Sequence, residues 1–328
     1  MKRQHSIFLH IYRVLILATA ITIFSPPFIS QASARWNIKA TDRDLKEVAD
    51  STLTLMAFTV LPDITTSSFS IENAYSDEPG IWQTTLGGGF TVSKEVPLYL
   101  EGTLGYSRYD PEFIATRGSE QRRIPVKWNS LAVTSGVGWD FLPFSNKNLK
   151  LRPIFNFTLG YVTTDVAVGQ TILNEKYNVD LDILDGGQMN AYGLGGSIML
   201  DYEDYNDNRE IDIELRYTHI HLESFSGTSD GLKGRSENNS LSLWARWRAP
   251  TNVILLKRPL RYVLETSITG FYGPQRGALG FDHLGSIGAG FELDSSAYLK
   301  RISRVRLVAR YLLGDSVTGY SVGLAVSF

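Results

Sequence analysis

The sequence predicts an all-β fold: a transmembrane antiparallel β-barrel of about 12 strands with an N-terminal helix in or near the lumen. Three observations support this prediction. The first residues have the pattern of a secretory signal, alternating apolar and polar segments recur from residue 66 onward, and the last segment ends on Phe328. Alternation predicts strands because successive side chains of a strand point to opposite faces.

Residues 1–34 are predicted to be a signal peptide. Lys2 and Arg3 precede an apolar run over residues 14–24, and Ala32 and Ala34 form an A-x-A cleavage site. The alternative is a membrane-anchor helix, but the run is shorter than the ~20 apolar residues that span a bilayer. We therefore expect secretion, with removal of residues 1–34.

The composition excludes several classes of function. Without the predicted signal peptide, Lys and Arg together fall from 32 to 29 against 34 acidic residues, so the formal charge changes from −2 to −5. A mildly acidic chain has no basic footprint for nucleic acid, and we expect no such partner. The chain has no cysteine, which excludes disulfides, thiolate metal sites and a Cys nucleophile.

Residues 35–65 are predicted to form an N-terminal segment with a helix in the lumen. Thr41-x-x-Asp44 resembles a capping box, and helical spacing of apolar residues follows from Leu45. Residues 53–60 could continue this helix or form an extra strand. A disordered periplasmic lead into the barrel is the alternative to a luminal helix.

Residues 66–328 are predicted to form the barrel domain. If both of its ends are periplasmic, the connections predicted outside include the longest ones and those predicted inside are mostly short. This asymmetry is typical of outer-membrane barrels. The predicted strands are 66–73, 83–93, 97–108, 129–141, 149–163, 188–203, 209–224, 238–249, 259–272, 280–293, 304–314 and 318–328.

The final segment has one face of large side chains and one face of Gly, Ser and Ala. The small face predicts an inner wall of small side chains, which leaves room for the helix expected at 42–58. We expect the large residues to face lipid and to form a C-terminal assembly signal. They are Tyr320, Val322, Leu324, Val326 and Phe328.

Together these features resemble a known family, the autotransporter β-barrel domain. The resemblance covers the helix candidate at 42–58, the segments from 66 to 328 and the aromatic ending. It implies an outer-membrane barrel with a helix running through its lumen. The chain departs from the family because only residues 35–65 separate the signal peptide from the first predicted strand. It is therefore similar to a solitary barrel that lacks a passenger.

Charged residues on the predicted inner faces are the main site candidate. Many acidic and basic residues occur together on these faces, which predicts that they pair with one another and brace the wall or hold the plug. The alternative is that they line a narrow polar pore and set its ion preference. The residues are Glu210, Asp212, Glu214, Arg216, Arg246, Arg248, Glu265, Arg304, Arg306 and Arg310.

A lipid-modifying hydrolase at the outer end of the strand 209–224 is an alternative function. His219 and His221 lie there, but the His-x-Ser spacing of outer-membrane lipid hydrolases is absent. Ser224 would point to the opposite face of a regular strand from His221. We therefore expect no catalytic residues, and no cofactor or metal site, because no metal-ligand spacing stands out.

The sequence thus predicts a non-enzymatic integral protein of the Gram-negative outer membrane, either a narrow or plugged channel or a surface structural protein. Expected partners are outer-membrane lipid and lipopolysaccharide, with the barrel-assembly machinery and periplasmic chaperones during biogenesis. The protein is expected to be a monomer. A barrel that translocates a separately encoded passenger is a further alternative.

Overall fold

The computed structural model describes residues 37–38, 42–60, 68–73, 81–109, 112–117, 120–125, 127–164, 187–273, 281–295, 304–315 and 317–327. The chain divides into two compact units. One is formed by Ile38–Ala115 with Arg122–Phe328, and the other by Met1–Asn37 with Thr116–Gln121. The larger unit contains the barrel and the helix. The predicted signal peptide lies outside the described residues.

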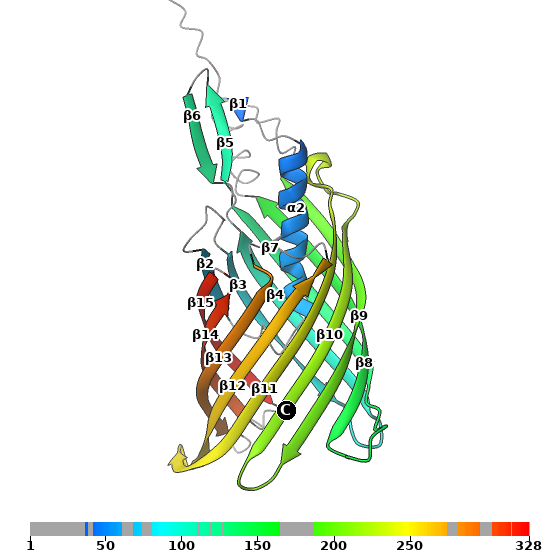
Figure 1. Ribbon diagram of the computed structural model, residues 1–328, viewed down its shortest axis with the longest axis vertical. Coiled ribbons are helices and arrows are strands. Elements are labelled where there is room, and N and C mark those ends of the chain that lie inside the picture. Colours follow the sequence, from blue (N-terminus) through cyan, green and yellow to red (C-terminus); the bar gives the residue numbers. More distant parts are fainter. Residues whose placement is uncertain are drawn as a thin grey trace, which may run out of the picture. The chain divides into compact units, whose positions relative to one another are not determined.

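In the larger unit, antiparallel strands close into a barrel (Figure 1). Each strand pairs with the next barrel strand along the chain, and β15 pairs with β2 to complete the ring. The predicted all-β barrel is therefore confirmed, with twelve strands in the described part of the chain. These are β2 (Ser68–Asn73), β3 (Ile81–Thr91), β4 (Leu98–Tyr109), β7 (Trp128–Trp139), β8 (Leu149–Thr164), β9 (Gln188–Tyr205), β10 (Glu210–Ser224), β11 (Arg235–Leu255), β12 (Arg258–Tyr272), β13 (His283–Asp294), β14 (Arg304–Gly314) and β15 (Val317–Ser327).

The strands alternate between an exposed apolar outer face and a buried inner face. On β14, Leu307 is exposed on the outside, whereas Arg306 and Val308 are buried on the inside. Exposed Leu, Val, Ile and aromatic residues recur at the outward positions of the barrel strands. An apolar exterior around a polar interior is the pattern of a barrel that spans a membrane.

The last strand shows the parity that the sequence predicts. Tyr320, Val322 and Leu324 are exposed on the outside, and the small residues between them are buried. The side chain of Val326 and the whole of Phe328 lie outside the described residues, so their part of the assembly signal stays a prediction.

The two ends of the barrel differ in the length of their connections. The end that we call the short-turn end has the connections 92–97, 140–148, 206–209, 256–257 and 295–303. The end that we call the long-loop end has the connections 74–80, 110–127, 165–187, 225–234, 273–282 and 315–316. Short turns face the periplasm and long loops face outward in outer-membrane barrels.

The hairpin of β11 and β12 extends further than the sequence predicts. The predicted strand 238–249 becomes β11, which runs to Leu255 and pairs there with Arg258. Leu256 and Lys257 form the turn with φ of 50° and 58°. Positive φ at both central residues is the type I′ geometry, which matches the twist of two antiparallel strands and lets their pairing continue to the tip.

The sequence does not predict a second sheet. β1 (Asn37–Ile38), β5 (Glu112–Arg117) and β6 (Glu120–Pro125) form a three-stranded sheet in the order β1-β5-β6. Two of these strands lie between the predicted barrel strands 97–108 and 129–141, where the sequence predicts only a connection.

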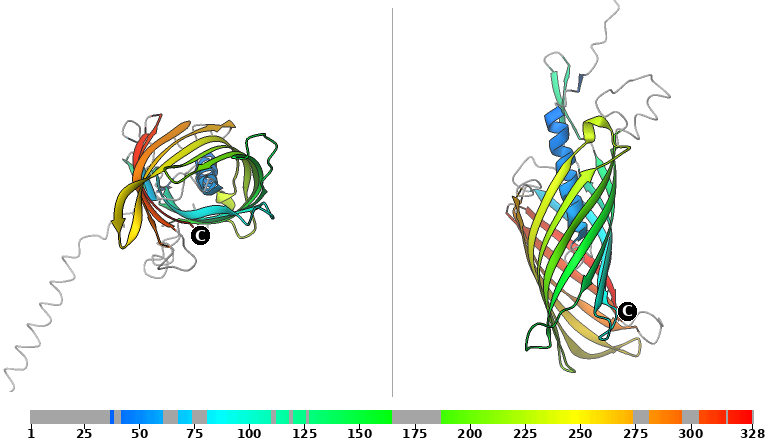
Figure 2. Two further views of the ribbon diagram at one scale, coloured as in Figure 1. Left: turned by 90° about the horizontal axis from the view of Figure 1, so that it is seen from below. Right: turned by 90° about the vertical axis from the view of Figure 1, so that its right-hand side faces the viewer.

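Helix α2 (Asp42–Met56) and the 3-10 turn η1 (Ala57–Val60) lie in the lumen. Figure 2 shows α2 inside the ring of strands. It packs against β4, β7, β10 and β11. The predicted N-terminal helix is therefore confirmed, and residues 53–60 are helical rather than an extra strand. In the described part of the chain, no helix combines the length and the apolar character needed to cross a bilayer.

Candidate functional site

The half of the lumen near the long-loop end is an apolar seat for α2 and η1. Leu53, Met56 and Phe58 are at most 3% exposed. The ring of Phe58 lies 5.1 Å from that of Phe271 on β12 and 6.3 Å from that of Phe281, between ring centroids. The wall of this seat also includes Trp128, Val162, Met189, Ile220, Leu222, Leu232 and Leu284. Apolar burial from both sides holds the helix in place.

A few polar contacts set the height of the helix in the lumen. The hydroxyl of Thr54 lies 2.7 Å from that of Ser236 on β11, and the hydroxyl of Thr59 lies 2.8 Å from that of Thr134 on β7. Asp50 accepts a 2.9 Å hydrogen bond from the backbone N–H at the start of β11. These bonds are directional, so they favour one position of the helix along the barrel axis.

Glycines in the wall allow the close approach of this segment. A Cβ added at Gly105 on β4 would lie 2.5 Å from Cγ2 of Thr59, and one at Gly160 on β8 would lie 2.6 Å from Sδ of Met56. The sequence instead predicts that the small inner residues of β15 make room for the helix. That stays a prediction, since the strands with the most contacts to α2 in the described part of the chain are β4, β7, β10 and β11.

The other half of the lumen, toward the short-turn end, is filled by paired charges. Arg216 on β10 forms two parallel hydrogen bonds, 2.9 and 2.7 Å long, with the carboxylate of Glu101 on β4. Asn156 on β8 donates to the same carboxylate at 2.6 Å. A fork of this kind is the strongest geometry for an Arg–carboxylate pair, and here it joins strands that are not neighbours.

A larger network surrounds Arg248 on β11. Its guanidinium lies 2.9 Å from Glu210, 3.0 Å from Asp212 and 3.1 Å from Glu292. Arg304 on β14 joins the network at 2.7 Å from Glu210. Together with the pairs that follow, this set of alternating charges involves five strands, β10 to β14. Its further pairs are Arg246 with Asp212, Arg261 with Glu210, Arg306 with Glu265 and Glu292, and Arg310 with Glu265.

A third group of charges lies around Arg152 on β8. Its guanidinium lies 2.8 Å from the carboxylate of Asp201, pairs with Asp140, and stacks 3.9 Å above the ring of Tyr99. Lys150 extends the group toward the short-turn end at 2.6 Å from Glu203. Every lumen charge in these groups therefore has an opposite charge within reach.

The structure places all ten predicted lumen residues on the inner face, and nine of them form the pairs above. Glu214 is half-buried on β10 between Asp212 and Arg216. The sequence does not single out eight further members, although each has the inward parity of its strand or directly follows it. They are Glu101, Asp140, Lys150, Arg152, Asp201, Glu203, Arg261 and Glu292.

The two candidate histidines lie on the outer face of β10. Nδ1 of His219 is 2.8 Å from the side-chain oxygen of Asn239, and Nδ1 of His221 is 2.6 Å from Glu237. The hydroxyl of Ser224 accepts from the N–H of Gly234 at 3.0 Å. Within the described ranges, no hydrogen bond joins Ser224 to either histidine, and no group of His, Asp and Glu has the geometry to hold a metal ion.

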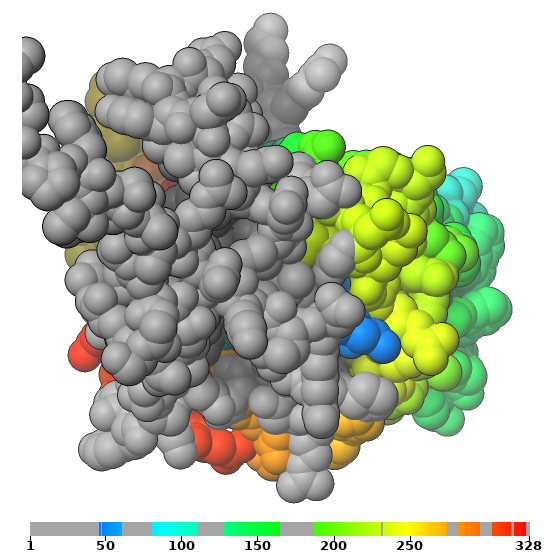
Figure 3. All heavy atoms as spheres, turned by 90° about the horizontal axis from the view of Figure 1, so that it is seen from above, coloured from blue at the N-terminus to red at the C-terminus, as the bar shows by residue number. Residues whose placement is uncertain are grey.

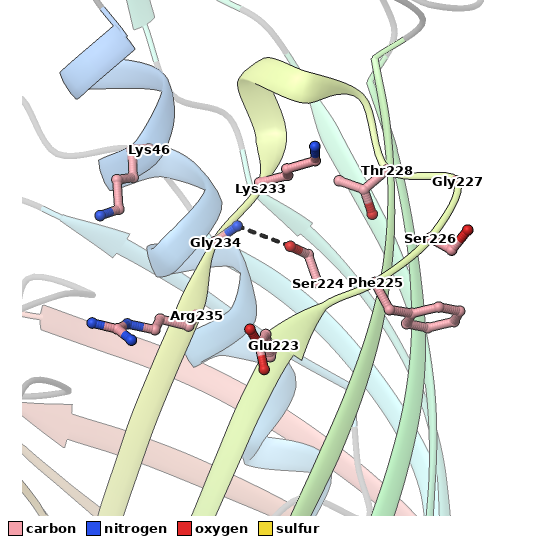
Figure 4. Close-up of a pocket in the computed structure, with 10 residues that line it drawn as sticks. All are labelled: Lys46, Glu223, Ser224, Phe225, Ser226, Gly227, Thr228, Lys233, Gly234 and Arg235. Carbon is pink, nitrogen blue, oxygen red and sulfur yellow. Dashed lines mark hydrogen bonds between the residues drawn. The ribbon is translucent and has the colours of Figure 1, made fainter.

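A pocket opens at the long-loop end between α2 and the β10–β11 connection (Figure 4). Its volume is about 670 Å³, and it is lined by Lys46 of α2 and, on the wall side, by Glu223, Lys233 and Arg235. In Figure 4 the side chains of Lys46 and Arg235 point to one side and that of Lys233 to the other. From above, atoms of α2 (blue) lie beside those of the β10–β11 region (yellow-green) at the surface (Figure 3). Hydrogen bonding and the positive charge of Lys233 lower the pKa of Asp230, beside the pocket. The sequence offers no local signal for this pocket because its two sides are far apart in the chain.

No family model and no curated protein sequence matches this chain. Among solved structures, the transport unit of the autotransporter AIDA-I from Escherichia coli matches with 12% identity and a TM-score of 0.44, covering 86% of this chain and 99% of that one. The β domain of the Bordetella autotransporter BrkA matches with 16% identity and a TM-score of 0.42, covering 80% and 97%. LpxR from Salmonella typhimurium matches with 8% identity and a TM-score of 0.36, covering 78% and 98%. The chain is similar in structure to these autotransporter domains and to LpxR.

Proposed function

We propose that this chain is a plugged channel of the outer membrane, a barrel whose lumen is closed by its own N-terminal helix. The apolar seat of α2 and η1 carries the proposal, because Leu53, Met56 and Phe58 are almost fully buried inside the ring of strands. A wall packed against a helix at van der Waals distance leaves little path for solutes. The charged half below it would be the polar stretch of the path once the helix moves.

The location and partners belong to the same proposal. The protein would lie in the Gram-negative outer membrane as a monomer, in contact with lipid and lipopolysaccharide, after removal of residues 1–34. The barrel-assembly machinery and periplasmic chaperones would insert it. The exposed apolar outer face supports the lipid contact. The proposed role involves no catalysis and no cofactor.

A conductance measurement tests the plug. In planar bilayers, the full chain should show low and infrequent conductance. Gly105→Val should raise it, because its side chain would collide with the stiff, β-branched Thr59 of η1. Gly102→Val is the matched control on the same strand, since a Cβ there meets nothing closer than 3.8 Å. Equal conductance in both variants and in the unaltered protein would contradict the plug.

A thiol reporter separates an unseated helix from a closed pore. The chain has no cysteine, so Ala49→Cys, at a fully buried position of α2, introduces a single thiol. Labelling of this thiol should be slow in the seated barrel and faster when Gly105→Val is added. If labelling accelerates and conductance does not, the barrel is a structural protein rather than a channel.

The direction of α2 favours translocation as a second candidate function. The chain enters the lumen at the long-loop end, where Lys46 lines the rim, and descends to Thr59 beside β7. A segment threaded this way is expected of a barrel that carries a chain outward. An epitope inserted before Trp36 should then be accessible on intact cells, and an epitope detected only after lysis would contradict this candidate.

A further inference from the structure

We propose that the tip of the β11–β12 hairpin is an arm that binds the phospholipid leaflet at the short-turn end, with a preference for anionic headgroups. The arm comprises residues 251–259, which follow a shift in the pairing of the two strands. Its apolar side chains would lie where headgroups meet acyl chains, and its cations would face the phosphates. The arm is separate from the lumen, so the proposal does not depend on the plug.

A bulge sets the arm apart from the wall. β11 pairs with β12 in regular register as far as Pro250, and the pairing resumes at Ile254 after two more residues on β11 than on β12. Asn252, inside the bulge, has a φ of 63°. A bulge bends its strand. Seen from below in Figure 2, the yellow tip of the hairpin lies outside the ring of strands.

Four consecutive apolar side chains are exposed at the tip. They are Val253, Ile254, Leu255 and Leu256, and Ile254 is 73% exposed. Along the wall part of β11, buried residues alternate with more exposed ones because every second side chain faces the lumen. The arm has lost this alternation, so it offers apolar surface on both of its faces. A contiguous exposed apolar patch marks a contact with another apolar surface.

The residue at the turn points to the same contact. Leu256 has a φ of 50°, at a position of a type I′ turn where Asn or Gly is preferred. A bulky side chain is unfavourable at this φ. Since Leu256 is 65% exposed, little of its apolar surface is buried in the fold whose turn it destabilises. A strained residue of this kind indicates a function, here a contact outside the chain.

The charge of the arm favours an anionic lipid. Residues 249–262 contain Lys257, Arg258 and Arg261 but no acidic residue, although the whole chain has a net charge of −2. Arg261 belongs to the lumen network, and Arg258 lies 3.9 Å from Asp294. Lys257 is exposed directly beside the apolar run. A cation next to apolar side chains matches the phosphates and acyl chains of an anionic leaflet.

The wall next to the arm identifies the membrane as the occupant. Trp247 on β11 and Tyr262 on β12 are exposed on the outer face near the short-turn end. Aromatic rings at such positions mark the interface between membrane and water. The arm begins within four residues of both rings. A hairpin that bends outward from this level meets lipid headgroups, and its apolar side chains enter the boundary below them.

A fluorescent reporter on the arm tests the contact. The chain has no cysteine, so Ile254→Cys introduces a single thiol for an environment-sensitive dye. The full chain is placed in phosphatidylcholine nanodiscs in which a fraction of the lipids carries a spin label near the headgroup. The dye at residue 254 should be quenched strongly. Asn208→Cys, exposed in the connection 206–209 at the same end, is the control. Quenching at residue 254 no stronger than at residue 208 would overturn the proposal.

A turn variant separates the apolar contact from the fold of the hairpin. Leu256→Asn places a preferred residue in the type I′ turn, so the hairpin should be retained. Quenching at residue 254 should nevertheless fall by about half, because interfacial binding scales with the apolar area that is buried. Val96→Asn, at an exposed apolar position of the connection 92–97, should leave it unchanged. Unaltered quenching in Leu256→Asn would contradict a role for the apolar run.

Two spin-labelled lipids test the headgroup preference. At equal fractions, spin-labelled phosphatidylglycerol should quench the dye at residue 254 up to about fivefold more than spin-labelled phosphatidylcholine, because a cation near the surface attracts anionic lipid. Lys257→Gln should bring this ratio close to one, whereas Lys94→Gln, an exposed cation at the same end, should not change it. Equal quenching by both lipids in the arm with Lys257 would overturn the preference for anionic headgroups.

Nanodiscs with one or two copies of the chain distinguish lipid from a second copy as the occupant. Equal quenching at residue 254 in both kinds of disc supports lipid. Loss of quenching in two-copy discs, with energy transfer between labelled arms, would overturn the proposal and indicate contact between copies. None of these measurements uses conductance, so a failure of the arm is distinguishable from a failure of the plug.

Discussion

The two halves of the lumen are filled by different chemistry. Near the long-loop end, apolar side chains of the wall surround a helix, with Leu53 fully buried. Toward the short-turn end, the wall strands meet through ion pairs such as Arg216 with Glu101. Apolar contacts are non-directional, so a segment held by them can leave as one body. Buried ion pairs are directional, and each member depends on its partner.

This difference suggests a division of roles. The apolar half holds a part that can move relative to the barrel, whereas the charged half joins strands of the barrel to one another. Arg248 by itself connects β10, β11 and β13. The charged half should therefore resist deformation of the ring, and the apolar half should control access to the lumen.

The largest effect is expected from breaking one ion pair. Arg216→Met removes both hydrogen bonds of the fork and leaves Glu101, whose side chain is 2% exposed, without its cation. Stranding a buried charge lowers the free energy of unfolding by about 3–5 kcal/mol. Urea unfolding in lipid vesicles measures this loss.

The double variant sharpens the test. Glu101→Met with Arg216→Met removes both charges and should recover most of the lost stability, because no unpaired charge remains. A loss below about 1 kcal/mol in the single variant, as for an exposed pair, would show that water screens this half of the lumen. Additive losses in the double variant would show that the two residues do not act as a pair.

A smaller and different effect is expected in the apolar half. Leu53→Ala should lower the free energy of unfolding by about 2–4 kcal/mol through lost burial and the cavity left behind. Amide hydrogen exchange of the Leu53→Ala variant should be faster in α2 and little changed in β10 and β11. Leu307→Ala is the control, the same truncation at an exposed position on β14. Faster exchange throughout the barrel would contradict the view that the seat can open by itself.

The sequence predicts those parts of the fold that depend on local alternation. Arg306, Leu307 and Val308 alone show which residues of β14 face inward and which face outward. Successive side chains of a strand point to opposite faces, and an apolar outer face requires apolar residues at every second position. The same rule correctly places the predicted charges on the inner face. It also identifies the helix, whose apolar spacing has a different period.

Partners across the lumen are not predictable in this way. Glu101 and Arg216 are 115 residues apart, and their pairing depends on the stagger of the strands and the diameter of the barrel. The rim pocket depends on how deeply α2 descends, which brings Lys46 to Arg235. The room for the helix depends on Gly105 and Gly160, whose neighbours are known only once the helix is placed.

The smallest effect is expected at an exposed pair, which provides the reference for the buried ones. Asp315, in the β14–β15 connection, lies 3.1 Å from Nδ1 of His283 and accepts from two backbone N–H groups at 3.0 Å. The hydrogen bond from His283 lowers the pKa of Asp315 below its ordinary value. The stabilisation is therefore present above the unfolded carboxyl pKa of about 4 and is lost as the pH falls through the lower folded value.

Because both side chains are about half exposed, Asp315→Asn should lower the free energy of unfolding by about 0.5 kcal/mol or less at pH 7, and by still less near pH 3. The same urea unfolding measures this loss. A loss as large as that of Arg216→Met would mean that burial does not explain why the ion pairs of the lumen contribute more to stability than this exposed pair.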